Sequence, residues 1–219
     1  MISKLFPAVL TTALCSTAIG ASAQDVGDVS ASLGLSTFGA NYEAMYQIRP
    51  NLRLRGAVMG GLDYSGTETE DGTTFDVDAE LNAFAALVDY YPTNSGWRVS
   101  GGLLVNGSNI NSSAVGSPSN PIEIDGVDYT SGTLDLDAEF ENTVAPMITT
   151  GYDYRFKDNW TLSGEVGAVY TGGIDLTAKG SSATLQSAID SSTDYSDARD
   201  DASDITFYPY LSVTVGYRF

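Results

Sequence analysis

The clearest pattern along the chain is an alternation of apolar and polar residues with a period of two. The last fifteen residues show it best, since every odd position from Ile205 to Phe219 is apolar or aromatic and the even positions are mostly polar or small. This period gives a β-strand one apolar face and one polar face. The same pattern predicts eight strands, at 29–37, 40–48, 52–64, 75–91, 97–110, 133–156, 160–176 and 205–219.

The connections between these strands alternate in length. Those after the second, fourth and sixth strands are short, and three of the others are long and polar: 65–74, 111–131 and 177–204. Short turns at one end and long loops at the other are typical of a transmembrane barrel with its turns in the periplasm. We therefore predict an all-β fold, an eight-stranded antiparallel up-and-down transmembrane β-barrel. Within the last loop, apolar spacing predicts a short amphipathic helix through Leu185, Ala188, Ile189, Ala198 and Ala202.

A soluble lipocalin-like barrel would show the same alternation with its apolar face turned inward. Aromatic residues near the strand ends favour the membrane barrel, because such residues form girdles at the membrane interfaces. The predicted interfacial aromatics are Trp97, Trp160, Tyr152, Tyr154 and Phe156. In the fourth strand this assignment turns the face from Phe75 to Leu87 towards lipid. Asp89 then breaks the register, which a bulge or a position below the hydrocarbon would resolve.

The N-terminus reads as a secretory signal peptide over residues 1–23. A basic start and an apolar run precede the small residues Ala21 and Ala23, and the mature chain is expected to begin at Gln24. We predict one outer-membrane barrel domain over residues 24–219. Leu14 before Cys15 argues against a lipoprotein, because lipid attachment requires a small residue at that position.

Composition limits the chemistry. The chain has 28 acidic and 10 basic residues, a formal charge of -18, no histidine and one cysteine, which leaves with the signal peptide. A mature chain without thiol or imidazole lacks the usual nucleophiles, bases and zinc ligands. Glu139 and Glu141 could in principle act as an acid–base pair, but a solvated acidic rim explains them more simply. We predict no enzymatic activity, no cofactor, no metal centre and no nucleic-acid partner.

The closing segment YPYLSVTVGYRF, with the signal peptide and eight strands, resembles small outer-membrane barrels of Gram-negative bacteria, the OmpA transmembrane-domain and OmpW-like proteins. The resemblance implies location in the cell outer membrane, among outer-membrane lipid and lipopolysaccharide. It also implies an assembly signal that the barrel assembly machinery reads during biogenesis. That signal would be Phe219, Tyr217, Val215, Val213 and Leu211.

If the apolar faces meet lipid, many charged residues point into the lumen. The predicted lumen charge network is Arg53, Arg55, Arg98, Arg155, Arg218, Glu43, Asp63, Glu80, Glu139, Glu141 and Glu165. An eight-stranded barrel is only wide enough for side chains to fill it, so Arg–Glu pairs are expected to fill this one. A small passive channel for small or hydrophobic solutes is the alternative.

The long loops carry most of the remaining acidic residues. Solvation explains them most simply, and divalent cations bound at the cell surface are the alternative. Three functions thus stay open: a structural role in membrane integrity, a surface-interaction role through loops 65–74, 111–131 and 177–204, and a small channel.

Overall fold

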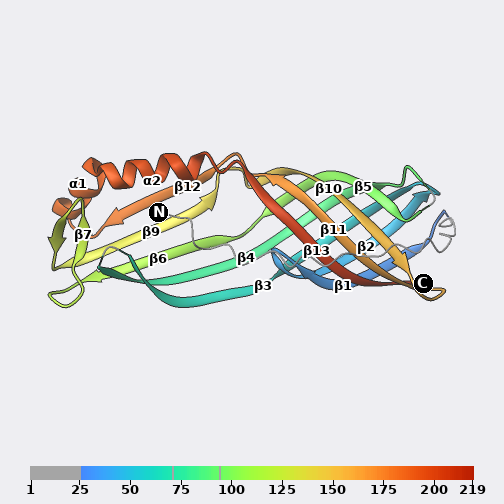
Figure 1. The fold of residues 1–219 in the computed structure, drawn as a ribbon, viewed down its shortest axis with the longest axis horizontal. Coiled ribbons are helices and arrows are strands. Elements are labelled where there is room, and N and C mark those ends of the chain that lie inside the picture. Colours follow the sequence, from blue (N-terminus) through green and yellow to red (C-terminus); the bar gives the residue numbers. More distant parts are fainter. Residues whose placement is uncertain (1–25, 71, 94) are drawn as a thin grey trace.

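The computed structural model describes residues 26–70, 72–93 and 95–219. They form a long molecule with a closed barrel at one end and a sheet flanked by two helices at the other (Figure 1). The predicted signal peptide, the start at Gln24 and Cys15 lie outside the described residues. The elements are β1 (Val29–Ser36), β2 (Gly39–Arg49), β3 (Leu52–Glu70), β4 (Thr73–Tyr90), β5 (Trp97–Asn106), β6 (Asn109–Gly116), β7 (Ile122–Ile124), β8 (Val127–Tyr129), β9 (Gly132–Phe140), β10 (Val144–Arg155), β11 (Trp160–Tyr170), β12 (Ile174–Gly180), α1 (Ala183–Ser191), α2 (Thr193–Ser203) and β13 (Phe207–Arg218).

Eight antiparallel strands close the barrel, which confirms the predicted fold class. Going round it, β5, β10, β11, β13, β1, β2, β3 and β4 pair in turn, and pairing of β4 with β5 completes the circle. Only the first part of β3 and the last part of β4 belong to the barrel wall. The connections after β2, β4 and β10 are short and lie at the end of the barrel where the C-terminus lies (Figure 1), here called the turn end.

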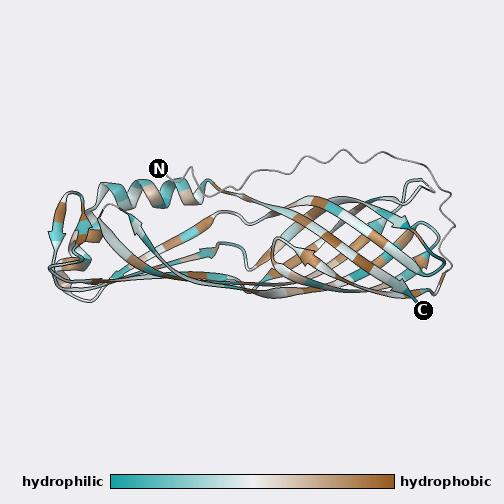
Figure 2. Ribbon diagram, turned by 60° about the horizontal axis from the view of Figure 1, so that its bottom comes forward, coloured by the Kyte–Doolittle hydropathy of each residue, from teal (hydrophilic) through white to brown (hydrophobic). Residues whose placement is uncertain are grey.

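The outer face of the barrel is apolar. Alternate residues such as Leu35, Ile148 and Val213 are 70%, 65% and 60% exposed, and apolar bands cross the strands of the barrel (Figure 2). A soluble barrel would turn these residues inward, and a continuous apolar surface of this kind marks contact with a nonpolar medium or partner. The orientation predicted for the barrel strands other than the fourth is therefore correct, and the soluble alternative does not fit.

Beyond the barrel, β3 and β4 continue as a long hairpin and join β6, β9 and β12 in one open sheet. Residues 62–70, 72–82, 107–143 and 171–206 make up this part, here called the extension. The two helices and the β7–β8 hairpin pack on one face of the sheet and form a second apolar core there. That core consists of Ala114, Ile122, Leu134, Ala178, Leu185 and Ile189. Among the described residues, neither helix is long and apolar enough to cross a membrane.

The extension accounts for several departures from the sequence-based expectations. Three predicted strands, 97–110, 133–156 and 160–176, are each two strands, one in the barrel and one in the extension. The predicted loop 65–74 is largely the tip of the β3–β4 hairpin, and much of 111–131 and 177–204 is regular. The single predicted helix is two helices, because Ser182 and Ser192 each cap a helix N-terminus with their hydroxyl groups.

The predicted orientation of the fourth strand is wrong. Its odd residues, among them Ala83, Ala85 and Leu87, face the inside, and Phe84 and Val88 form the outer face. Asp89 is therefore in register, fully buried in the lumen, and β4 needs no bulge. The apolar face of β4 was assigned to lipid, but half of the strand lies in the extension. There the apolar face is the inner one, which the helices shield from water.

A bulge in β3 marks the border between barrel and extension. The β3–β4 register shifts between Met59 and Leu62, and Gly61 has a φ of 77°, which favours glycine. One extra residue moves every later side chain to the opposite face. Odd residues of β3 thus point into the lumen up to Met59, and Asp63 points outward.

Asp125 holds the β7–β8 hairpin against α2. It has a φ of 49° and precedes Gly126 at 78°, as a two-residue hairpin turn with Asp-Gly requires. Its carboxylate accepts hydrogen bonds from the Ser192 hydroxyl at 2.9 Å and from the backbone N–H of Thr193 at 3.1 Å. The first of these bonds, together with the backbone bonds at the start of α2, lowers the pKa of Asp125.

We expect Asp125→Asn to loosen the contact between the hairpin and α2, because the amide keeps one acceptor oxygen and loses the charge. Trypsin should then cut after Arg199 faster than in the wild type. Asp128→Asn, in the same hairpin with an exposed side chain, is the matched control and should leave the rate unchanged. Equal rates for both variants would contradict this role.

The lowered pKa also fixes the pH dependence of this contact. A carboxyl whose pKa is lower in the folded state stabilises the fold above its ordinary value of about 3.9 and loses that contribution as the pH falls. The contact should therefore be intact at neutral pH and weaken only below that value. The carboxyl carbon chemical shift of Asp125 should titrate with a midpoint below the ordinary aspartate value.

Candidate functional site: the barrel lumen

Seven charged side chains meet inside the barrel, nearer the turn end than the middle. They come from six strands, β2, β3, β4, β5, β10 and β11, at positions that alternate with lipid-facing residues. Each is at most 6% exposed. This cluster, here called the ionic belt, consists of Arg53, Arg55, Arg98, Glu43, Asp89, Asp153 and Glu165.

Asp89 lies at the centre of the belt and pairs with all three arginines. Its carboxylate oxygens lie 2.7 Å from a guanidinium nitrogen of Arg53, 3.0 Å from Arg55 and 3.7 Å from Arg98. The Nε–H groups of Arg53 and Arg55 also donate to it, at 2.8 and 3.2 Å. One carboxylate thus binds guanidinium groups from β3 and β5, the two strands that flank β4 in the barrel wall.

Glu165 connects the belt to the opposite wall of the barrel. Its carboxylate accepts two hydrogen bonds from Arg55, each 2.6 Å, and lies 3.0 Å from Arg98. The hydroxyl of Thr149, on the adjacent strand, also donates to it. Glu43 approaches Arg55 from a third side, at 2.9 Å. Such forked pairs suit arginine, whose planar guanidinium matches carboxylate geometry and stays charged.

Asp153 completes the belt on the side of β10. It lies 3.2 Å from Arg53 and 3.1 Å from Arg98, and it accepts hydrogen bonds from the hydroxyl groups of Tyr91 at 2.6 Å and Ser163 at 2.9 Å. Every charged member of the belt therefore has an opposite charge within 4 Å. Removing water from ions is tolerated only when they are paired in this way.

Above the belt, an apolar layer occupies the lumen. Its members pack as one buried cluster: Phe38, Ala57, Met59, Ala83, Ala85, Leu87, Leu104, Ala145, Met147, Val169 and Tyr210. Phe38 lies in the turn between β1 and β2, and the others alternate with outward-facing residues on the barrel strands. Phe140 and Tyr208 close it at the border with the extension. The Tyr208 ring lies 4.9 Å from Phe38 and 5.3 Å from Phe140 between centroids. Side chains thus occupy the lumen at two successive levels.

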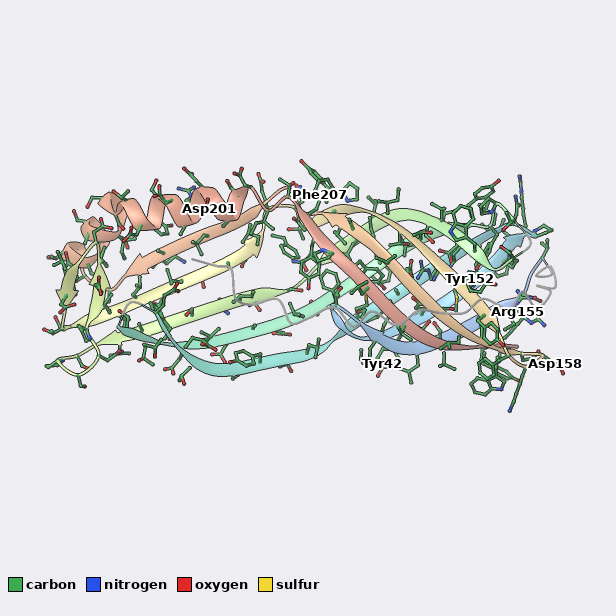
Figure 3. The ribbon with its side chains drawn as sticks, in the orientation of Figure 1. Tyr42, Tyr152, Arg155, Asp158, Asp201 and Phe207 are labelled. Carbon is green, nitrogen blue, oxygen red and sulfur yellow. The ribbon has the colours of Figure 1, made fainter. Side chains whose placement is uncertain are left out.

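Below the belt, the lumen opens at the turn end. Arg218 pairs with Asp28 at 3.3 Å and donates to the backbone oxygen of Asp158 at 3.2 Å. Arg155 is half-buried nearby, and Figure 3 places it beside Asp158 at this end of the barrel. A cavity of about 30 Å³ lies between these residues and Arg53, which is enough room for water.

The structure brings together only part of the predicted lumen network. Arg53, Arg55, Arg98, Glu43 and Glu165 lie in the belt, and Arg155 and Arg218 line the mouth at the turn end.

Four acidic residues of that prediction do not lie in the lumen. Asp63, Glu80, Glu139 and Glu141 are exposed in the extension. The bulge turns Asp63 outward, and Glu80 and Glu139 lie on the wet face opposite the helix-covered core. Glu141 lies in the break between β9 and β10, where the alternation restarts.

Two belt residues were not among the predicted ones. Asp89 had appeared as an error in the register of the fourth strand, and this irregularity was the signal that could have found it. Asp153 alternates with Arg155 on the polar face of its strand, so the period alone would have placed it inside.

The predicted interfacial aromatics all lie on the outer surface near the turn end. Trp97, Trp160, Tyr152, Tyr154 and Phe156 are between 39% and 45% exposed. Figure 3 shows Tyr152 on the outside of β10. Trp160 also packs edge-on against Tyr217, 5.1 Å away, and Tyr217 against Phe219, 5.4 Å away. These rings form part of an aromatic band round one rim of the barrel, where a membrane interface would lie.

The residues of the predicted assembly signal lie on or directly after β13, the last strand of the chain. β13 pairs with β1 and β11, and Leu211, Val213 and Val215 face outward with Tyr217. Their reading by an assembly machinery stays a prediction. Within the described residues, no group of three or more acidic, cysteine or histidine side chains is arranged to hold a metal ion.

No protein-family model matches the chain, and no curated protein matches it significantly. Two solved structures from Acinetobacter baumannii resemble it. CarO2 is 22% identical, with a TM-score of 0.59, over 90% of this chain and 100% of that chain. CarO is 19% identical, with a TM-score of 0.60, over 88% of this chain and 98% of that chain.

The chain has the CarO fold. At these identities the likeness concerns architecture, and it agrees with the expected resemblance to small outer-membrane barrels.

Asp89→Asn should destabilise the barrel strongly. It leaves three buried arginines with one carboxylate fewer, and breaking a buried ion pair from one side costs about 3–5 kcal/mol. We expect the loss to appear in guanidinium chloride unfolding of the protein in detergent micelles. Asp158→Asn, in an exposed turn, should change the free energy of unfolding by less than about 0.5 kcal/mol. A loss below about 1 kcal/mol for Asp89→Asn would contradict the central position of this residue.

Proposed function

We propose that this protein is an integral outer-membrane protein whose barrel is a sealed anchor and whose extension carries its interactions at the cell surface. The single observation that carries the proposal is the double filling of the lumen, by the ionic belt and by the apolar layer above it. A barrel whose lumen is filled at two levels serves as an anchor. Interactions with partners then fall to the extension, which lies outside the barrel.

The apolar outer wall supports the membrane location. Its exposed aliphatic residues lie between an aromatic rim at the turn end and a second aromatic site where barrel meets extension, marked by Phe207 (Figure 3). There the Tyr170 and Phe207 rings pack at 5.3 Å. Apolar bands bordered by aromatic residues are the pattern of outer-membrane barrels. The partners in this proposal are outer-membrane lipid, lipopolysaccharide and, during biogenesis, the barrel assembly machinery.

Charge supports a role for the extension outside the membrane. Its basic residues are Lys179 and Arg199 alone, whereas acidic residues are numerous: Asp63, Glu68, Glu70, Asp76, Asp78, Glu80, Glu123, Asp125, Asp128, Asp135, Asp137, Glu139, Glu141, Asp175, Asp190, Asp194, Asp197, Asp200, Asp201 and Asp204. Arginines and carboxylates are nearly matched in the barrel. The negative charge of the chain thus gathers in the extension, which has to lie in water.

The proposed role is non-enzymatic, as the absence of histidine and of any cysteine after Cys15 favours. Binding of divalent cations to the acidic extension stays a prediction, and the geometry of the described residues offers it no specific support. The extension is instead a surface with its own core, held apart from the membrane by the barrel.

The sealed anchor predicts electrical silence. Refolded wild-type protein in a planar lipid bilayer should give no conductance steps above those of the protein-free membrane. Steady single-channel steps from the wild type would contradict the proposal and favour the small passive channel.

A variant opened at both levels provides the positive control. Arg98→Ala with Glu165→Ala removes one pair of opposite charges from the belt, and Met59→Ala with Leu104→Ala thins the apolar layer. Because the two levels lie in series, each pair of changes alone should leave the protein silent. The four changes together should produce conductance steps, if gel mobility shows that the variant has refolded.

A further inference from the structure

We propose that the free edge of β3 in the extension, residues 62–70, binds an extended basic peptide segment of a partner protein, which joins the sheet as an additional strand. This inference rests on the proposed function, because that function places the extension in the medium outside the cell. The experiment below works on protein in micelles, so that it can fail independently of the membrane assignment.

The edge is unpaired along its whole length in the described part of the chain. β2 pairs with β3 only as far as Gly60, and from Leu62 to Glu70 the strand pairs with β4 on one side only. The opposite edge of the same sheet, β12, contacts both helices. Figure 1 shows the helices beside β12 and the β3 edge on the far side of the sheet. Of the two edges of this sheet, the described residues therefore leave the β3 edge open to a partner.

A free edge of this kind offers a ladder of backbone groups. On an antiparallel strand every second residue directs its N–H and C=O away from the existing neighbour, and an incoming strand can bind them. The bulge at Gly61 sets this segment apart from the barrel wall, so the free edge begins where the lipid-facing surface ends. The segment spans nine residues, enough for a short peptide strand.

Carboxylates border the edge on both faces of the sheet. On the inner face, the Tyr64 hydroxyl donates to Glu68 at 3.3 Å, and Glu70 lies two residues further along. On the outer face Asp63 is exposed, and the Ser65 hydroxyl donates to Asp78 on the neighbouring strand at 2.6 Å. The sequence from 62 to 82 contains no lysine or arginine.

These charges select the occupant. Cross-strand neighbours of like charge repel, and those of opposite charge attract. A second copy would bring an equally acidic edge against this one, so the charges protect the edge from self-association. Lysine or arginine at alternate positions of a partner strand would instead lie beside Glu68 and Glu70 on one face. A further cation could lie beside Asp63 on the other.

The test uses a capped octapeptide of alternating lysine and valine, added to wild-type protein refolded in detergent micelles at low ionic strength. We expect saturable binding by isothermal titration calorimetry and slower backbone hydrogen exchange within residues 62–70, with β6 unchanged. The same peptide N-methylated at alternate backbone nitrogens keeps its charge but cannot form the ladder. It should bind at least about tenfold more weakly.

Matched variants separate the edge from general charge attraction. Glu68→Gln with Glu70→Gln should weaken binding by about tenfold. Asp197→Asn with Asp201→Asn removes the same charge from α2, where Figure 3 shows Asp201 far from β3, and should weaken binding less than about twofold. Both pairs lie at exposed positions, so the fold should be retained.

The proposal is overturned if no binding occurs, if both variant pairs weaken binding equally, or if the N-methylated peptide binds as well as the parent. Protein that binds the peptide yet conducts ions in bilayers would overturn the sealed anchor and leave the edge site standing. Protein that neither conducts ions nor binds the peptide would overturn the edge site and leave the sealed anchor standing.

Discussion

The whole structure depends on one constraint. The face of the continuous sheet that is shielded from water is the outer face in the barrel and the inner face in the extension. In the barrel the outer face meets a nonpolar medium and the inner face carries charge, whereas in the extension the inner face is covered by helices and the outer face is acidic. β4 crosses the border without a change of phase, so Leu81 and Leu87 both point inward while its outer face changes from Asp78 to Val88. β3 crosses it by the bulge at Gly61 instead.

The ionic belt fixes the register of the barrel wall. Replacing a buried ion cluster by apolar residues is often neutral or stabilising, so net stability alone does not account for the belt. A one-residue slip of any belt strand, however, would turn a charge such as Arg55 or Asp89 towards the nonpolar outside and leave its partners unpaired. The pairing spans six strands, and it therefore penalises wrong registers almost everywhere round the barrel. The apolar layer, which has no directional contacts, adds packing but little such discrimination.

The sequence allowed the fold class, the number of barrel strands and the short turns to be predicted, because alternation and turn residues are local signals. It also placed Arg53, Arg55 and Glu165 on inward faces. Alternation defines two faces of a strand and leaves open which medium each face meets. The prediction of which face points into the lumen was therefore wrong where the medium changes, as at Glu80 and Glu139. It was also wrong at the break at 141–143, after which the alternation begins anew. The long loops hid a second core because its apolar residues are scattered over short elements.

Repulsion between acidic residues opposes the folding of the extension. Its sheet sets Asp63 opposite Glu80 and Glu139 opposite Asp175 in the cross-strand register, and like charges at such positions destabilise a sheet. Its own apolar core, separate from the apolar layer of the barrel, has to offset that repulsion. Such a region opens locally more readily than the barrel. Cations near the outer face would relieve the repulsion, so the proposed basic partner at the β3 edge would also stabilise the extension. Repulsion within the acidic face thus destabilises the free protein, and cations or a basic partner in its surroundings would reduce that repulsion.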